Sequence, residues 1–126
     1  MKVVQSALIF AVMSCLVSSA CGQQWPSKSS RFLSPYAPGG GSDILARTIG
    51  GKLSENLGVT VVVDNRPGGG GVLGTEIVTK SPPDGYTLML GTPASITVAP
   101  WLMKKLPYEP LRDLTPITLV SIVPAL

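Results

Sequence analysis

Hydrophobic residues beyond position 30 fall into short β-type runs separated by longer stretches with helical spacing. The β-branched run at 59–63 is typical of a strand buried on both faces, and 31–33 and 86–90 predict two further strands. Apolar residues at the spacing of one helix face are Leu45, Ala46, Ile49, Leu53 and Leu57. A shorter helix is expected from about 72 to 80, ahead of two prolines. This alternation of strand and helix predicts an α/β fold with a parallel sheet.

The ends and the interior of the longer helix carry signals of their own. Ser42 or Asp43 is expected to cap its start, and Gly58 stands where a left-handed residue would end it. Gly50 and Gly51 weaken its interior by roughly 1 kcal/mol each, so tertiary packing must hold this helix together.

Each predicted strand is followed by a loop rich in glycine or other small residues. These loops lie at 35–41, 65–71 and 91–95, and an amphipathic segment is expected after the last of them, at 101–106. Open parallel sheets bind ligands outside the carboxyl ends of their strands, so the three loops should gather around one site. The three glycines at 39–41 let a ligand approach the backbone closely, and N–H groups at a helix start point at an anion. These features favour a binding site for a carboxylate or phosphate. The alternative is that the segment is only a flexible connection that needs glycine for its turn.

The second and third loops repeat this design. Four glycines occupy 68–71, and Thr92 and Ser95 add hydroxyl groups after the third strand. The charged residues near the loops are Asp43, Asp64 and Arg66. Such a pocket would hold its ligand mainly through neutral donors and helix termini, which suits reversible capture.

A competing interpretation is a dinucleotide-binding loop, because 69–74 satisfies G-x-G-x-x-G between a strand and a helix. However, 65–68 lengthens the turn before the first glycine, and no acid follows Leu90 at the end of the next strand. The ATPase phosphate loop fails because Ala46 stands where the glycine five places before Gly51 is required. A serine hydrolase is disfavoured because the sequence has no histidine and no nucleophile elbow.

The first residues predict export from the cytoplasm. Lys2 precedes a mostly apolar core at 3–17, and small residues follow at 18–20. A core of about 15 residues is typical of a cleavable signal peptide and is short for a membrane span of about 20. We therefore predict a signal peptide at 1–22 and a soluble periplasmic product. A lipid anchor on Cys21 is the alternative, because the residues around it resemble the end of a lipobox.

Composition narrows the chemistry of the exported part. Both cysteines, Cys15 and Cys21, lie in or beside the leader, so cysteine catalysis and zinc sites built on Cys or His are excluded and no cofactor is expected. One of the 10 basic residues is Lys2, which leaves 9 against 7 acids and a charge of about +2. That charge is diffuse, and the pair Lys104 and Lys105 is too short to indicate nucleic-acid binding.

Several motifs together resemble the N-terminal part of the Bug family, the solute-binding receptors of tripartite tricarboxylate transporters. The motifs are WPSK at 25–28, PYAPGGGSD at 35–43, VVVDNRPG at 61–68, PDGYTL at 83–88, GT at 91–92 and LPY at 106–108. They occur in order and cover essentially the whole segment after the leader. Ser29, Ser30 and Ser34 depart from the family pattern and are expected to loosen the first strand.

The resemblance implies a type II periplasmic-binding-protein-like fold, with two lobes joined by a hinge. Residues 23–115 would form the N-terminal part of lobe 1, and 116–126 would begin the crossover toward lobe 2. The apolar run at 117–126 breaks off without a stop signal, which suggests that the sequence is truncated.

The resemblance also implies a noncatalytic receptor that binds a small carboxylate, typically a di- or tricarboxylate, and presents it to membrane permease subunits when the lobes close. We expect it to act as a monomer. Backbone amides and bridging waters on the three loops would hold one carboxylate. The ligand-binding residues would be Pro38, Gly39, Gly40, Gly41, Ser42, Asp43, Asn65, Gly69, Gly70, Gly71, Thr92 and Ser95. An exported enzyme acting on a small organic acid is the alternative function, and a dinucleotide-binding domain is a more remote one.

Overall fold

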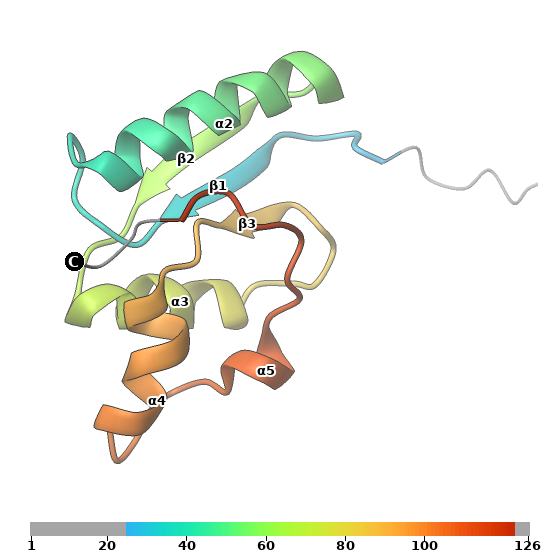
Figure 1. The fold of residues 1–126 in the computed structure, drawn as a ribbon. Helices are drawn as coiled ribbons and strands as arrows, with labels where there is room; N and C mark the ends of the chain where they lie inside the picture. The colour runs from blue at the N-terminus through green and yellow to red at the C-terminus, as the bar shows by residue number, and fades with distance from the viewer. Residues whose placement is uncertain (1–24, 123–126) are drawn as a thin grey trace, which may run out of the picture.

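The computed structural model describes residues 25–122, which contain a three-stranded parallel sheet (Figure 1). The strands are β1 (Ser30–Ser34), β2 (Val61–Asn65) and β3 (Thr87–Met89), in the spatial order β2-β1-β3. The parallel α/β architecture predicted from the sequence is confirmed. The predicted leader and the lipid anchor on Cys21 lie outside the described residues.

Helices connect the strands as the sequence pattern predicts. The long helix α2 (Gly41–Leu57) follows β1, and the turn η2 (Gly69–Gly71) leads into α3 (Val72–Thr79) after β2. Beyond β3, the π-helical turn η3 (Ala94–Val98) runs into α4 (Ala99–Leu102), and α5 (Pro110–Asp113) comes last. Gly58 ends α2 in the left-handed conformation with φ of 68°, as predicted.

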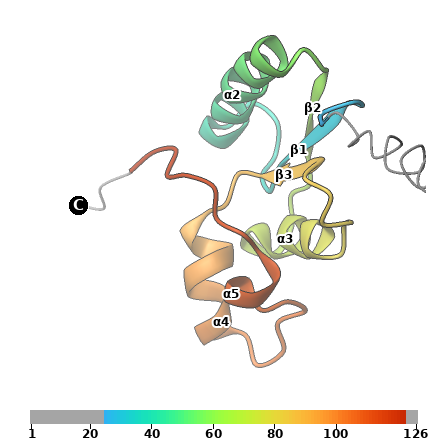
Figure 2. The same ribbon diagram turned by 90° about the vertical axis from the view of Figure 1, so that its right-hand side faces the viewer.

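Helix α2 covers one face of the sheet, over β1 and β2 (Figures 1 and 2). The buried residues of this layer are Phe32, Ala46, Val61 and Leu90. A Cβ atom on Gly50 would lie 3.2 Å from Cγ2 of Val63, so the helix approaches the sheet closely because position 50 has no side chain. This packing offsets the poor helix propensity of the glycine pair inside α2.

Helix α3 covers the opposite face, against β1 and β3. Its Gly74 lies so close to β1 that an added Cβ atom would be 2.9 Å from Cβ of Pro35 and 3.0 Å from Cδ2 of Leu33. Leu33 has no exposed surface, and burying such a side chain contributes about 1.5–3 kcal/mol. The sheet is therefore the middle of three layers, and β1 is its central strand.

One expectation about the second strand is wrong. The run at 59–63 was expected to be buried on both faces, but the observed strand runs from Val61 to Asn65 and Val62 is 50% exposed. The reason is position in the sheet: β2 lies at an edge, and α3 contacts β1 and β3 but leaves the outer face of β2 open. The strand with the weaker sequence signal, β1, takes the central place.

The serines of β1 do not break the strand. Ser30 and Ser34 are 3% and 0% exposed, and both pair in parallel register with β2. Their hydroxyl groups have no hydrogen-bond partner within the described part of the chain, which costs about 1–3 kcal/mol for each buried group. The strand therefore bears the cost of two buried polar groups while keeping its register.

The segment after β3 also differs from expectation. The third loop was expected at 91–95 and an amphipathic segment at 101–106, but helical structure begins at Ala94 and ends at Leu102. The side chain of Trp101 is 88% exposed, so it is not part of the core. The Ala99 N–H donates to Ala94 O in a π-type bond, and Pro100 has no N–H to continue the helical ladder.

Candidate functional site

The three loops meet at the carboxyl ends of the strands, and Tyr36 joins them. Its hydroxyl lies 3.5 Å from the Gly70 carbonyl oxygen of the second loop and 3.3 Å from Oγ1 of Thr92 in the third. Its own carbonyl accepts a 3.1 Å hydrogen bond from Nδ2 of Asn65 at the end of β2. The expected convergence of the loops is therefore present, with a tyrosine at its centre that the sequence reasoning did not select.

The first loop surrounds an open hollow of about 620 Å³. Its lining residues are Tyr36, Ala37, Pro38, Gly39, Gly40, Gly41 and Ser42. Helix α2 begins at this hollow, and the N–H groups of Asp43 and Ile44 donate to the Gly40 carbonyl oxygen at 3.0 and 3.1 Å. Within residues 25–122, the N–H groups of 40–42 donate to no protein acceptor. Three unpaired donors at a helix start make this hollow suited to an anion.

The helix cap differs from the sequence expectation. Gly40 is the N-cap residue and no side chain caps the helix there, so Ser42 and Asp43 lie inside the first turn. Asp43 instead reaches backwards: its Oδ2 accepts a 3.0 Å hydrogen bond from the Gly39 N–H. The helix begins earlier than expected because Gly40, in an extended conformation, serves as the N-cap residue without a capping side chain.

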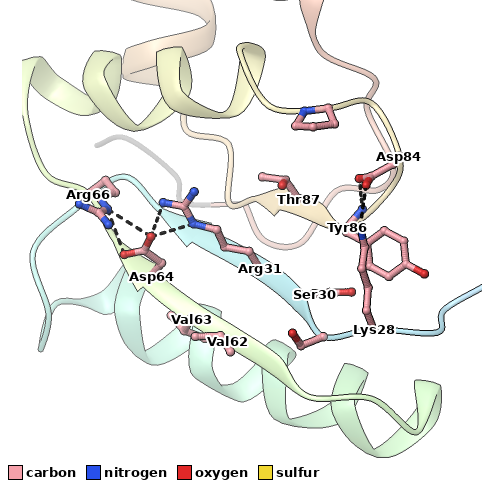
Figure 3. A pocket seen from close by; sticks show the side chains of 12 residues that line it. Lys28, Ser30, Arg31, Val62, Val63, Asp64, Arg66, Asp84, Tyr86 and Thr87 are labelled. Atoms are coloured by element: carbon pink, nitrogen blue, oxygen red, sulfur yellow. Dashed lines mark hydrogen bonds and ion pairs between the residues drawn. The ribbon is translucent and has the colours of Figure 1, made fainter.

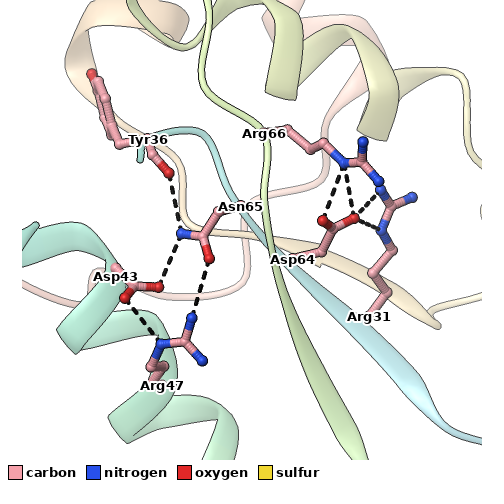
Figure 4. A network of polar contacts seen from close by, with 7 residues as sticks. All are labelled: Arg31, Tyr36, Asp43, Arg47, Asp64, Asn65 and Arg66. Carbon is pink, nitrogen blue, oxygen red and sulfur yellow. Dashed lines mark hydrogen bonds and ion pairs between the residues drawn. The ribbon is translucent and has the colours of Figure 1, made fainter. Parts of the chain in front are cut away.

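Asp43 is buried beneath the first loop and fully engaged (Figure 4). Nε of Arg47 donates to its Oδ2 at 3.0 Å, and Nδ2 of Asn65 donates to its Oδ1 at 2.9 Å. The hydrogen bond from Arg47, followed by those from Gly39 and Asn65, lowers the pKa of Asp43 from 3.8 to about 2. The carboxylate is therefore ionised at neutral pH and its charge is balanced by Arg47. The i, i+4 spacing of Asp43 and Arg47 is a sequence signal for this ion pair, but the pair was not predicted.

The second loop closes on itself through hydrogen bonds to two of its carbonyl groups. Its glycines at 68–71 all have positive φ, which only glycine adopts readily. The Gly68 carbonyl oxygen accepts from the N–H groups of Gly71 and Leu73, and the Gly69 carbonyl oxygen accepts from Val72. The N–H groups of Gly71, Val72 and Leu73 at the start of α3 therefore already have protein acceptors. This closed turn disfavours a pyrophosphate at the start of α3, and Gly74 is explained by its contact with β1 rather than by a cofactor.

The third loop packs against the second loop. Thr92 Oγ1 lies 3.4 Å from Oγ of Ser95, and Ser95 has no exposed surface. A Cβ atom on Gly71 would lie 3.3 Å from Cβ of Ser95, so the second and third loops are in close contact. Of the expected site residues, the first-loop residues 38–42 line the hollow, whereas Asp43, Asn65 and Ser95 are engaged behind it.

A second hollow, of about 600 Å³, lies on the sheet face away from α2 (Figure 3). Arg31 and Arg66 both donate to the Asp64 carboxylate there, Nε of Arg31 at 2.7 Å. Burial raises the pKa of Asp64, but the hydrogen bonds from the two arginines outweigh it and leave that pKa below its usual value. Asp64 and Arg66, which the sequence places near the loops, thus point away from the glycine hollow (Figure 4).

The first hollow is the better candidate of the two. It lies at a carboxyl end of the sheet, where open parallel sheets bind ligands, whereas the second extends from the starts of β1 and β3 to the end of β2 and its charges already pair with each other. In residues 25–122 there is no cluster of acidic, cysteine or histidine side chains able to hold a metal, and no helix there has the length and apolar character to cross a membrane.

Solved structures of periplasmic binding proteins share this fold. The MatC protein of Rhodopseudomonas palustris with bound malate is 34% identical, with a TM-score of 0.72 over 76% of this chain and 33% of that chain. An R. palustris protein solved with adipate is 36% identical, with a TM-score of 0.62 over 69% of this chain and 29% of that one. The fold therefore defines a protein of the periplasmic solute-binding class.

The sequence relatives specify the family. The sequence model described as "Tripartite tricarboxylate transporter family receptor", or TctC, matches residues 45–126. Protein BugT of Bordetella pertussis is 38% identical over 92% of this chain and 36% of its own length. The chain belongs to the tripartite tricarboxylate transporter receptor family, which includes the Bug proteins. It spans about a third of the length of the curated relatives that it matches.

Proposed function

We propose that the chain is the part of an extracytoplasmic receptor that holds one carboxylate group of a small di- or tricarboxylate or related acid. The observation that carries this proposal is the start of α2, where the N–H groups of 40–42 have no acceptor among residues 25–122 and border an open hollow. A carboxylate placed there would accept from these N–H groups and lie on the positive end of the helix dipole. Malate and adipate, bound by two structural relatives, are acids of this class.

The expected ligand-binding residues divide into two roles under this proposal. Residues 38–42 would contact the acid or the waters around it, and the exposed glycines 69 and 70 would border it from the second loop. Asp43, Asn65 and Ser95 would support the loops from behind, since their polar atoms are engaged with the protein. Thr92 would connect the two groups through Tyr36.

The wider role is that of a binding protein in transport. A cleavable leader at 1–22 would export the chain to the periplasm, and the loaded receptor would pass its acid to membrane permease subunits. Residues 23–115 would belong to lobe 1 and 116–126 would lead toward lobe 2, which would contact the other end of the acid. We propose no catalytic step, because the hollow presents backbone donors and no pair of groups arranged as nucleophile and base.

Thermal unfolding of the leader-free gene product against a panel of acids tests the proposal. The panel contains malate, adipate, citrate and a monocarboxylate, with NAD and a sugar as controls. An acid present at 100 times its dissociation constant stabilises the folded state by about 2.7 kcal/mol, which raises the midpoint by a few degrees. Stabilisation by one or more of the acids alone supports the receptor. Stabilisation by NAD and by no acid would instead favour the interpretation of G-x-G-x-x-G at 69–74 as a dinucleotide-binding loop.

A further inference from the structure

The side chain of Asn65 uses both ends of its amide to fasten the first loop. Its Nδ2 donates to the Tyr36 carbonyl oxygen at 3.1 Å and to Oδ1 of Asp43 at 2.9 Å. Its Oδ1 accepts from Nη2 of Arg47 at 3.3 Å. Asn65 is the last residue of β2, so these three contacts join a fixed strand end to both sides of the glycine loop (Figure 4).

Asp43 places a negative charge directly behind the proposed anion site. It lies in the first turn of α2, beside the glycines that line the hollow, and it is 4% exposed. Such a charge would repel a carboxylate ligand, since unit charges a few ångströms apart interact strongly where water is partly excluded. Arg47 contacts the same carboxylate at 3.0 Å and balances its charge.

We infer that Asn65 and Arg47 are positioning residues of the carboxylate site. Asn65 ties the glycine loop to β2. Arg47 balances the charge of Asp43, so that an anion bound by the free N–H groups of the loop is not repelled by Asp43. This inference rests on the proposed function of the site. Neither side chain needs to touch the ligand, because both act through Asp43 and the loop backbone.

The variant Asn65→Asp tests the first half of the inference. It replaces the amide, which donates to Asp43, by a second carboxylate about one hydrogen-bond length away. The two carboxylates repel each other when both are ionised, and this repulsion ends at lower pH, where the pair shares a proton. Asp43 and Arg47 are the charged groups that contact position 65; Asp64 and Arg66 pair with each other on the other side of β2. We expect malate or adipate affinity, relative to wild type, to fall about tenfold or more at pH 7.5 and to recover toward pH 5.

Matched variants separate positioning from general damage. Asn56→Asp makes the same chemical change on an exposed position of α2 and should leave affinity unchanged at both pH values. Asn65→Ala should lose affinity without recovery at low pH, and hydrogen exchange at the Gly39 N–H should accelerate even without ligand, because the loop loses its tie to β2. Wild-type exchange at Gly39 together with wild-type affinity in either Asn65 variant would overturn the role of Asn65.

The variant Arg47→Gln tests charge cancellation. Its affinity for the same acids should fall several-fold at low salt. The deficit relative to wild type should shrink in about 1 M salt, because the Arg47 side chain is 56% exposed and ions can reach it and the open hollow. Lys52→Gln, the same charge change on an exposed face of α2, serves as the control and should show little deficit. A deficit for Arg47→Gln that does not change with salt would overturn the electrostatic role.

The outcomes distinguish this inference from the function on which it rests. If wild type binds malate, adipate or citrate and all the Asn65 and Arg47 variants bind equally well, the inference is wrong and the proposed function stands. If wild type binds none of these acids, the proposed function fails, and the inference fails with it.

Discussion

The hydroxyl of Tyr108 donates a 2.8 Å hydrogen bond to the carbonyl oxygen of Ser95, in a buried position beneath the third loop. This bond compensates for a gap in the helix. Pro100 has no N–H, and the Ala99 N–H bonds to Ala94, so Ser95 has no helical partner for its carbonyl group. Tyr108 lies far along the chain from β3, and through this contact it fixes the turn that supports the loops.

The variant Tyr108→Phe should therefore be destabilised. It removes the donor and leaves a buried carbonyl oxygen without a partner, which costs about 1–3 kcal/mol. Urea unfolding of the leader-free chain measures the change. Tyr86→Phe is the control, because its hydroxyl contacts are exposed and its loss should cost no more than about 0.5 kcal/mol. Equal stability of the two variants would contradict the role assigned to Tyr108.

Gly74→Ala should also lower the free energy of unfolding, by about 1–3 kcal/mol. The added methyl group would lie 2.9 Å from Cβ of Pro35 and 3.0 Å from Cα of that residue, so α3 must move away from β1. The control Gly51→Ala adds a methyl group to α2 with no atom within 4 Å and should stabilise the protein by about 0.5–1 kcal/mol. Opposite signs in one denaturation series are the expected result, and a loss in both would contradict the packing described here.

The sequence pattern was sufficient for the order of strands and helices up to β3, because periodicity and glycine position report on local structure. It identified the glycine loop at 39–41 and the left-handed Gly58. It misjudged β2, because burial of a strand depends on which helices cover it, and that is a property of the whole sheet. Tyr36 and Arg47 were missed for a similar reason, since their partners come from other loops and the contacts exist only after the strands align.

Acid should destabilise the protein through Asp43. Its pKa is lowered on folding from 3.8 to about 2, so its contribution to stability is complete above about pH 4 and is lost as the pH falls toward 2. Asp43→Asn should be less stable than wild type at pH 7 and should lose less on acidification across that interval. Unfolding curves at several pH values measure the difference. Parallel curves for the two proteins would contradict the assigned contacts of Asp43.

The two loop glycines offer different tests of the site. Gly40 has an ordinary φ of −81°, and a Cβ atom there would lie 3.7 Å from the Ala37 carbonyl oxygen, so Gly40→Val fits the fold but would block the hollow. We expect its acid affinity to fall at least about tenfold, or 1.4 kcal/mol, with a small change in melting temperature. Gly70→Val should lose affinity and also about 1–2 kcal/mol of stability, because Gly70 has φ of +66°. Unchanged affinity in Gly40→Val would place the site elsewhere.

The most direct measurement is an NMR titration of the leader-free chain with the acid that stabilises it most. The amide resonances of Gly40, Gly41 and Ser42 should move further than those of Gly71 and Val72, whose N–H groups already have protein acceptors. That result would place the carboxylate at the start of α2. Shifts concentrated around Arg31 and Arg66, with the first loop unchanged, would contradict the account and assign the ligand to the second hollow.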